Sequence, residues 1–247
     1  MQLHGLSKLT LLDFPGHLAC TAFTGTCNFR CPYCHNAPLV LAPGSCPVIT
    51  EEEFFEFLTS RKGKLDGVCI TGGEPTLQPD LSEFISKIKA MGLLVKLDTN
   101  GYQPEVLKKL LDAQLLDMVA MDIKNSRDFY ASTAGVHEAS FELERIEKSI
   151  SLLLQSGIRH EFRTTVTQEV HNAEQMQSIG AWLSGLGGKI FHTSTLPSVY
   201  YIQNFKDSGN LVCGDTACFH PVDEKVLQDF ISVVQPYIPN TKLRGQG

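Results

Sequence analysis

Short apolar runs alternate with longer amphipathic stretches along the 247-residue chain. This alternation is typical of βα units, because buried parallel strands read as short apolar runs and the covering helices repeat every 3.6 residues. The pattern predicts strands at residues 18–24, 67–71, 93–97, 118–121, 160–166 and 189–192. It predicts helices that begin near Thr50, Asp80, Pro104, Phe141 and Asn172, and a last helix over 223–234.

The predicted elements form about six βα units, fewer than the eight of a complete TIM barrel. Thr50 and Glu53 have the spacing of a capping box, and Pro104 suits a first helical turn. The predicted fold is α/β, either a partial TIM barrel with a C-terminal helix or an open doubly wound sheet. Because the chain has no repeat and no low-complexity linker, we expect one domain over 1–247, with 195–221 a surface loop and 222–247 a C-terminal helix and tail.

The composition excludes several classes of protein. Hydrophobic residues make up 43% of the chain, enough for a proper core, and the formal net charge is -6. No Lys/Arg run provides the basic footprint of nucleic-acid binding. No run approaches the ~20 apolar residues of a spanning helix, and the first residues lack the layout of a signal peptide. We therefore expect a cytoplasmic protein without a nucleic-acid or membrane partner.

Three of the eight cysteines are close together, as Cys27, Cys31 and Cys34 in a C-x3-C-x2-C arrangement after the first predicted strand. Clustered thiols in an intracellular protein favour a metal or redox site over disulfides. Three thiolates without an obvious fourth ligand suit a four-iron cluster with one open iron. The alternative is a structural zinc knuckle completed by His35. The looser pair Cys213 and Cys218 forms either a small zinc site with His220 or two unconnected loop thiols.

Three acidic residues follow predicted strands at regular spacing. Glu74 lies in the segment Thr71-Gly-Gly-Glu-Pro75. Asp98 follows Glu74 by 24 positions, and Asp122 follows Asp98 by another 24. Because the carboxyl ends of parallel strands meet at one edge, we expect the three carboxylates side by side on one rim, continued by Arg163 and His192. The competing interpretation is ordinary turn and capping chemistry, for which Gly and Asp are well suited.

The cysteine spacing with Tyr33 as C-x3-C-x-aromatic-C resembles the hallmark of the radical S-adenosylmethionine (SAM) superfamily. More narrowly, Gly5–Gly16 and the segment Phe23–Asn36, which ends in Cys-Pro-Tyr-Cys-His-Asn, resemble the activating enzymes of glycyl radical enzymes. Among these the chain is most similar to the long, barrel-type activating proteins of anaerobic ribonucleoside-triphosphate reductase.

This resemblance implies a [4Fe-4S] cluster held by the three cysteines, with SAM chelating the open iron. An electron from a donor such as flavodoxin or ferredoxin would cleave SAM to methionine and a 5′-deoxyadenosyl radical. That radical would remove the Cα hydrogen of one glycine in a partner glycyl radical enzyme, and the resemblance points to anaerobic (class III) ribonucleotide reductase as this partner. The cofactors carry the chemistry, so no side chain is expected to act as a general acid or base.

The resemblance also implies residue roles. Glu74 would accept from the SAM amino group, Lys124 would meet the SAM carboxylate, and Arg163 is either a SAM contact or a salt-bridged rim residue. His192 is either a SAM contact or a satisfied core histidine. A monovalent cation would bind Asp98, Thr99, Asp122 and the carbonyl of Met121. The complete set of expected SAM-binding residues is Tyr33, Gly72, Gly73, Glu74, Asp98, Asp122, Lys124, Arg163 and His192.

Three other functions compete with activation of the reductase. The chain could activate an enzyme of the pyruvate formate-lyase type, act on a small molecule as 7-carboxy-7-deazaguanine synthases do, or bind metal without catalysis. A partner glycine reaches a radical only if its loop enters this protein, so we expect residues 195–221 and the N-terminal strand edge to border a docking surface.

Overall fold

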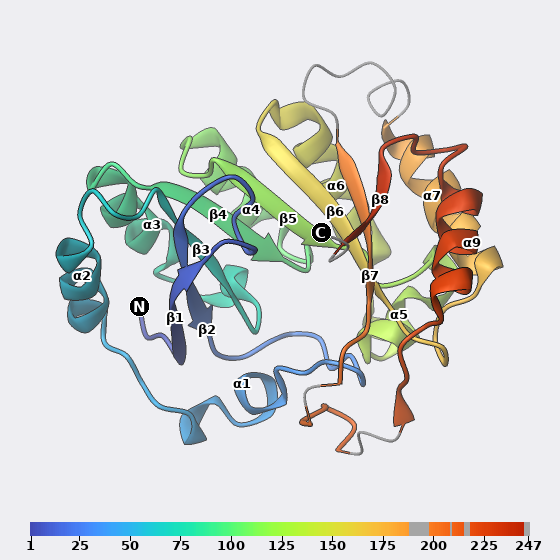
Figure 1. Ribbon diagram of the computed structural model, residues 1–247, viewed down its shortest axis with the longest axis horizontal. Coiled ribbons are helices and arrows are strands. Elements are labelled where there is room, and N and C mark those ends of the chain that lie inside the picture. The colour runs from blue at the N-terminus through green and yellow to red at the C-terminus, as the bar shows by residue number, and fades with distance from the viewer. Residues whose placement is uncertain (188–197, 208, 215–217, 245–247) are drawn as a thin grey trace. The chain divides into compact units, whose positions relative to one another are not determined.

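The computed structural model describes residues 1–187, 198–207, 209–214 and 218–244, and its eight strands lie in one sheet in the order β1 to β8 (Figure 1). The first pair, β1 and β2, is antiparallel, whereas the pairs β2–β3, β3–β4, β6–β7 and β7–β8 are parallel. Because the strand order follows the chain and never reverses, the sheet has no switch point of the doubly wound kind. The doubly wound alternative is therefore wrong.

The strands are β1 (Gly5–Thr10), β2 (Ala19–Thr24), β3 (Gly67–Gly72), β4 (Leu94–Thr99), β5 (Met118–Asp122), β6 (Arg159–Val166), β7 (Val199–Asn204) and β8 (Thr241–Arg244). The helices are α1 (Ala37–Leu41), α2 (Glu51–Ser60), α3 (Leu81–Ala90), α4 (Pro104–Asp112), α5 (Tyr130–Ala134), α6 (Leu143–Ser156), α7 (Ala173–Gly187) and α9 (Glu224–Val234). The first five predicted strands match β2 to β6 within two residues, and the predicted helices match α2, α3, α4, α6, α7 and α9.

The capping box that the sequence predicts for α2 is present. The Thr50 hydroxyl accepts from the Glu53 backbone N–H at 3.2 Å, and a Glu53 carboxylate oxygen accepts from the Thr50 N–H at 2.7 Å. Two N–H groups that the first helical turn leaves without a partner are satisfied in this way, so α2 begins at Glu51.

The expected surface loop over 195–221 is wrong for Val199–Asn204, which form β7. Tyr200 and Ile202 alternate inward and are fully buried, while the polar residues on either side conceal this short period in the sequence. Two further strands, β1 and β8, were not predicted. The sixth predicted strand, 189–192, lies outside the described residues.

The chain divides into two compact units. Unit 1 comprises residues 1–28, 36–99 and 105–119, and unit 2 comprises residues 29–35, 100–104 and 120–247. The expectation of a single domain stays a prediction.

Unit 1 is built on β2, β3 and β4. Val68 and Leu97 on one face of these strands are fully buried, whereas the other face carries the polar row Thr21, Cys69 and Lys96, whose members lie opposite one another in register. The Leu12-Asp-Phe-Pro-Gly16 turn connects β1 and β2 at the N-terminal end of the parallel strands. Its Phe14 ring covers that end. It is buried against Ala19 and Met118, with Leu94 packed beside them. This motif, which carries part of the resemblance, therefore closes the strand end.

Unit 2 is built on β6, β7 and β8 with α7 and α9 packed together. A Cβ atom on Gly180 would lie 3.2 Å from the Tyr237 ring and 3.3 Å from Val234, so the glycine lets the two helices approach closely. The Trp182 indole N–H donates to the Glu147 carboxylate at 2.9 Å.

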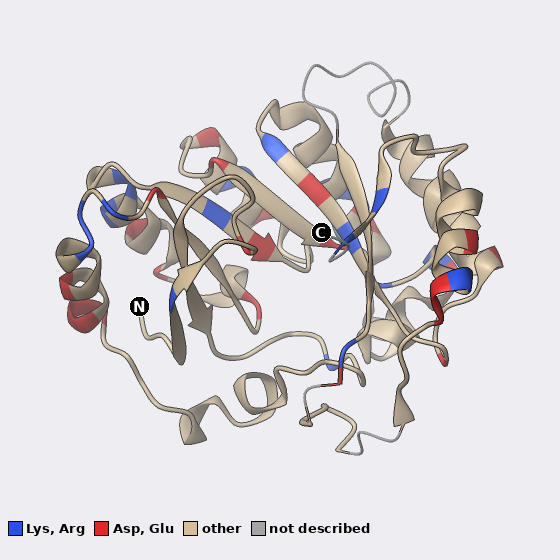
Figure 2. Cartoon of the chain, in the orientation of Figure 1, with Lys and Arg blue, Asp and Glu red and all other residues tan. Residues whose placement is uncertain are grey.

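Charged side chains are distributed over both units, and the Lys and Arg residues in Figure 2 occur on many separate elements. Within the described ranges, no helix combines the length and the apolar character that crossing a membrane would require.

Candidate functional site

The cysteine motif occupies the segment that follows β2. Cys31 is buried, Cys27 and Cys34 are half-buried, and none of the three forms a disulfide. In unit 2 the Cys34 N–H donates to the Cys31 carbonyl at 3.0 Å, which folds the last two thiols into one turn. The Arg30 N–H donates to the Ala134 carbonyl at 2.8 Å and ties this turn to α5.

A second segment of unit 2 holds the same turn. The Val212 N–H donates to the Cys34 carbonyl and the Cys213 N–H to the Pro32 carbonyl, both at 3.1 Å. These bonds place the exposed Cys213 beside the cysteine motif through its backbone. The sequence offered no signal for this pairing, because loops join through positions that carry no periodicity.

Tyr33, the aromatic residue of the motif, is buried and makes edge contacts with the rings of His171 and Phe219, at centroid distances of 6.4 and 5.9 Å. Burial raises the pKa of Tyr33 well above its usual value, so the phenol stays protonated. Its hydroxyl has no hydrogen-bond partner in the part of the chain that the structure describes. A buried hydroxyl of this kind fits a bound ligand at this turn.

The donor set fits a cluster better than a single ion. No group of three or more His, Cys, Asp or Glu side chains in the described ranges could hold one metal ion. In unit 2 the Cys31 and Cys34 thiols lie in one turn with the unsatisfied Tyr33 hydroxyl, and these groups fit one side of a [4Fe-4S] cluster and an adjacent ligand.

The two glycines of Thr71-Gly-Gly-Glu-Pro75 are needed because neighbouring backbone atoms leave no room for a side chain. Gly72 has a φ of +118°, and a Cβ atom there would lie 2.4 Å from the Thr24 carbonyl oxygen. On Gly73 a Cβ atom would lie 1.8 Å from the Thr26 carbonyl oxygen, and the Glu74 N–H donates to that oxygen at 2.7 Å. The glycines therefore let this motif pack against the segment that leads into the cysteines. A close approach of SAM to the same backbone stays a prediction.

Glu74 is almost fully buried in unit 1, with 1% of its surface exposed. Its Oε1 atom accepts from the Thr76 N–H at 3.0 Å, from the Thr76 hydroxyl, and from the Thr99 hydroxyl of β4 at 2.8 Å. These donors fix the carboxylate at the carboxyl ends of the neighbouring strands β3 and β4, where the sequence predicts it.

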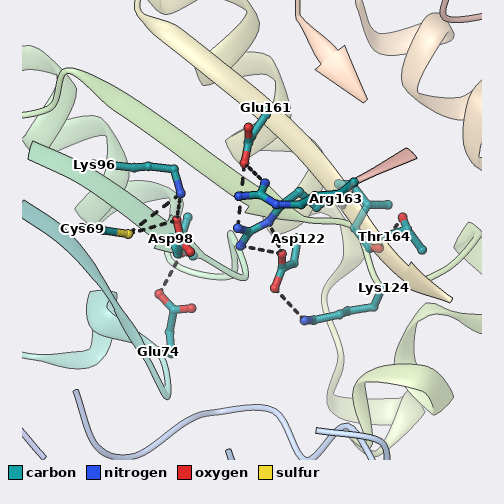
Figure 3. Close-up of polar contacts among 12 residues, drawn as sticks. Cys69, Glu74, Lys96, Asp98, Asp122, Lys124, Glu161, Arg163 and Thr164 are labelled. Atoms are coloured by element: carbon teal, nitrogen blue, oxygen red, sulfur yellow. Dashed lines mark hydrogen bonds and ion pairs between the residues drawn. The ribbon is translucent and has the colours of Figure 1, made fainter. Parts of the chain in front are cut away.

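Asp98 of β4 is paired with a residue that the sequence analysis missed. Lys96 lies two positions earlier on the same strand and is fully buried, and its Nζ atom donates to Asp98 Oδ1 (Figure 3). Cys69 on β3 completes the group, its Sγ atom 3.9 Å from Lys96 Nζ and 3.8 Å from Asp98 Oδ1. The available signal was the i, i+2 spacing, which puts Lys96 and Asp98 on one face of a strand.

Asp122, the last residue of β5, lies in unit 2 between two cations (Figure 3). Its Oδ1 atom is 2.9 Å from a terminal guanidinium nitrogen of Arg163, and its Oδ2 atom is 3.0 Å from Lys124 Nζ. Burial alone would raise the pKa of Asp122, but the charges and hydrogen bonds of Lys124 and Arg163 hold it well below its usual range. Burial lowers the pKa of Lys124, but Asp122 outweighs this effect, so Lys124 stays charged.

Arg163 contacts a second carboxylate, that of Glu161, at 3.9 Å. Glu161 is 2% exposed and also pairs with Arg244 of β8. The structure therefore contains the salt bridges of the rim interpretation of Arg163, and a role toward SAM stays a prediction.

Both carboxylates expected around a monovalent cation already have cationic partners in the chain. In unit 1 Asp98 is paired with Lys96, and the Thr99 hydroxyl donates to Glu74. In unit 2 Asp122 is paired with both Lys124 and Arg163.

Two further sequence expectations have separate outcomes. His192 lies outside the described residues. The Nδ1 atom of His220 is hydrogen-bonded to a Glu169 carboxylate oxygen at 2.7 Å, and a zinc site with Cys213 and Cys218 stays a prediction.

Comparison with known proteins adds a family. The radical SAM superfamily profile matches residues 21–183, which include all three cysteines of the motif. A protein of Methanocaldococcus jannaschii, provisionally named a glycyl-radical enzyme activating enzyme, is 36% identical over 180 residues, covering 71% of this chain and 72% of that protein.

Two other relatives match over shorter lengths. A GTP 3′,8-cyclase of Nautilia profundicola is 32% identical over 156 residues, which are 61% of this chain and 48% of the cyclase. The pyruvate formate-lyase-activating enzyme of Listeria monocytogenes is 31% identical over 133 residues, which are 50% of this chain and 53% of that enzyme.

Solved structures show the fold. A radical SAM methyltransferase from Sphaerobacter thermophilus matches with a TM-score of 0.68 and 11% identity, covering 95% of this chain and 68% of that one. A domain of pyruvate-formate lyase-activating enzyme from Bacteroides vulgatus matches with a TM-score of 0.56 and 17% identity, covering 72% and 99%. The predicted α/β partial-barrel fold is confirmed.

Proposed function

The chain belongs to the radical SAM superfamily and is a radical SAM enzyme, and from this premise we propose that it activates a glycyl radical enzyme. The observation that carries the proposal is the match to the Methanocaldococcus jannaschii protein, which includes 72% of that protein's length. The match to the GTP 3′,8-cyclase is similar in identity but includes only 48% of the cyclase. The higher identity and the larger matched share of both proteins therefore favour an activating enzyme.

Family membership implies a [4Fe-4S] cluster and SAM as cofactors. When bound, they supply one-electron cleavage of SAM, with the electron coming from a reduced donor of the flavodoxin or ferredoxin class. Cys27, Cys31 and Cys34 would hold the cluster, and the Tyr33 hydroxyl would meet the nucleotide.

Charged residues of each unit have separate tasks in this proposal. Glu74, fixed by the hydroxyls of Thr76 and Thr99, would accept from the SAM amino group. The ion-pair network of Asp122, Glu161, Lys124, Arg163 and Arg244 has three positive charges against two negative charges, and its surplus would bind the SAM carboxylate. None of these side chains needs to move a proton.

We propose anaerobic ribonucleoside-triphosphate reductase as the partner, because the segments Gly5–Gly16 and Phe23–Asn36 resemble those of its activating proteins. The second candidate partner is an enzyme of the pyruvate formate-lyase type, which the match to the Listeria monocytogenes enzyme favours. Both partners carry the target hydrogen on a glycine Cα atom, so one spectroscopic signal reports on either.

The docking surface is expected along the N-terminal strand edge and along the described part of residues 195–221. Leu9, Leu11 and Leu12 at the end of β1 and in the following turn are 58%, 68% and 79% exposed, which suits contact with another protein. Hydrogen exchange of the complex should show protection at both segments. Unchanged exchange at both would refute this docking surface.

The decisive experiment is anaerobic mixing of the reconstituted protein with SAM, a reductant and each candidate partner, followed by electron paramagnetic resonance. We expect a glycyl radical doublet with one partner and stoichiometric 5′-deoxyadenosine and methionine. A new nucleobase-like product without any partner would instead establish a small-molecule enzyme, and colourless zinc-loaded protein would establish a metal-binding role.

The matched variants for this experiment are Cys31→Ala and Cys46→Ala. Cys31→Ala should lose the iron chromophore and SAM cleavage completely while circular dichroism stays that of the wild type, because the motif lies on a loop. Cys46 lies outside the motif, so Cys46→Ala should retain both. SAM cleavage by Cys31→Ala would remove this thiol from the ligand set.

A further inference from the structure

Lys96 and Asp98 form a buried ion pair in unit 1. Lys96 lies in the middle of β4 and has no exposed surface, and its ammonium contacts the Asp98 carboxylate two positions later on the same face of the strand. A lysine ammonium this deep in a protein is costly unless it is paired, and the Asp98 carboxylate supplies the pairing.

The neighbouring strands complete the surroundings of this ammonium. Cys69 lies opposite Lys96 in the register of β3 and β4, and Thr21 lies opposite Cys69 in the register of β2 and β3. The thiol of Cys69 is within 4 Å of both charged groups, whereas the Thr21 hydroxyl donates to Asp13 at 2.5 Å. The ammonium is therefore held between polar atoms of the adjacent strands β3 and β4.

A metal cation on the same oxygen would be next to a positive charge. Lys96 donates to Asp98 Oδ1, and two like charges a few ångströms apart repel strongly where water is excluded. The Thr99 hydroxyl is used as a donor to Glu74 at 2.8 Å. The Asp98 oxygen that a monovalent cation would need is thus already bonded to a cationic group of this chain.

We propose that the Lys96 ammonium is a built-in cation that fixes the Asp98 carboxylate, so that this chain needs no monovalent metal cation there. Lys96 is then a positioning residue that acts through Asp98. The proposal concerns this ion pair alone and stands whichever partner or substrate the enzyme has.

The test compares the wild type with Lys96→Met, which keeps most of the length of the side chain and removes its charge. Thermal unfolding of the reconstituted protein is followed in choline chloride, potassium chloride and ammonium chloride at equal ionic strength. The wild type should unfold at one temperature in all three salts. Lys96→Met should unfold roughly 10 °C lower in choline chloride, because a buried carboxylate is left unpaired, and should regain part of this loss in the two small cations.

Lys89→Met is the matched control, because Lys89 pairs with Asp117 at 2.6 Å but both side chains are more than a quarter exposed. It should show no difference between the salts. Stabilisation of the wild type by potassium over choline would overturn the proposal, and so would a Lys96→Met variant that no small cation stabilises.

If Lys96→Met does not fold in choline, folding restored by potassium or ammonium still supports the proposal. The double variant Lys96→Met/Asp98→Asn removes both charges and should fold without a response to the salts. A rubidium soak of wild-type crystals gives an independent readout by anomalous scattering. Rubidium bound at Asp98 would overturn the proposal, and its absence there would support it.

Discussion

Two aspartates at the ends of neighbouring strands in the chain have different surroundings. Asp98 in unit 1 has one fully buried lysine as its partner, so the charges cancel. Asp122 in unit 2 pairs with Lys124 and Arg163, and the ion-pair network that continues to Glu161 and Arg244 has a positive surplus of one charge. The first ion pair leaves no net charge, whereas the second arrangement retains attraction for an anion such as a carboxylate. Two aspartates at the carboxyl ends of consecutive strands therefore need not have the same function.

The largest expected difference between the two regions is in stability. Lys96→Met should lower the free energy of unfolding by about 3–5 kcal/mol, because it leaves a buried carboxylate unpaired. Lys124→Met should lower it by about 1 kcal/mol, because Arg163 still pairs with Asp122 and Lys124 is partly exposed. Urea denaturation of both variants measures this contrast. Equal losses would show that the two regions are not of different kinds.

A glycine substitution tests whether the Thr71-Gly-Gly-Glu-Pro75 motif is as rigid as its contacts indicate. Gly73→Ala should cost about 3 kcal/mol, because its Cβ atom would lie 1.8 Å from the Thr26 carbonyl oxygen and the cysteine-bearing segment would have to shift. Gly185→Ala in α7 is the control, since no atom lies within 4 Å of the added carbon, and it should stabilise by about 0.5 kcal/mol. A neutral effect of Gly73→Ala would mean that this segment adapts freely.

SAM affinity is expected to depend on the Glu74 carboxylate of unit 1. Glu74→Ala should weaken SAM binding by about 2 kcal/mol, roughly 30-fold, because a charge-assisted hydrogen bond is lost. Anaerobic isothermal titration measures this loss. Glu74→Gln keeps an acceptor for the Thr99 hydroxyl and should fall between Glu74→Ala and the wild type. An unchanged dissociation constant in Glu74→Ala would exclude Glu74 from the SAM site.

The smallest expected effect is on acid stability. The pKa of Asp122 is lowered in the folded state, so its contribution is present above the unfolded value of about 3.8 and is lost as the pH falls through the lowered value. Between pH 5 and pH 2.5, roughly, Asp122→Asn should lose about 1 kcal/mol less stability than the wild type, since the partly exposed pair is screened by solvent. Chemical denaturation at several pH values checks the sign. Parallel curves for the two proteins would refute the assignment.

Much of the fold follows from local patterns. The capping box at Thr50 and the apolar run of β3 appear in the structure because cap chemistry and side-chain period act within a few residues. β7 was missed because only Tyr200 and Ile202 mark it, and its membership of the sheet depends on pairing with β6. Short strands of this kind are stabilised by contacts with residues far away in the chain.

The candidate site shows the same division. Sequence spacing identifies Cys27, Cys31 and Cys34 and assigns Glu74 and Asp122 to strand ends, and the structure supports those strand-end positions. It does not identify Lys96 as the partner of Asp98, because a lysine in a strand is normally expected at the surface. It also does not distinguish a salt-bridged Arg163 from a ligand contact.

The sequence by itself determines the order of the elements, the three-thiol motif and the acidic residues after the strands, because these depend on composition and short-range spacing. The tertiary structure alone decides which charge neutralises which. The register of β3 on β4 places Cys69 beside the Lys96–Asp98 pair, and the strand β6 brings Arg163 to Asp122. Electrostatic energy depends on distance in space and on exclusion of water, and neither quantity is written in the order of residues.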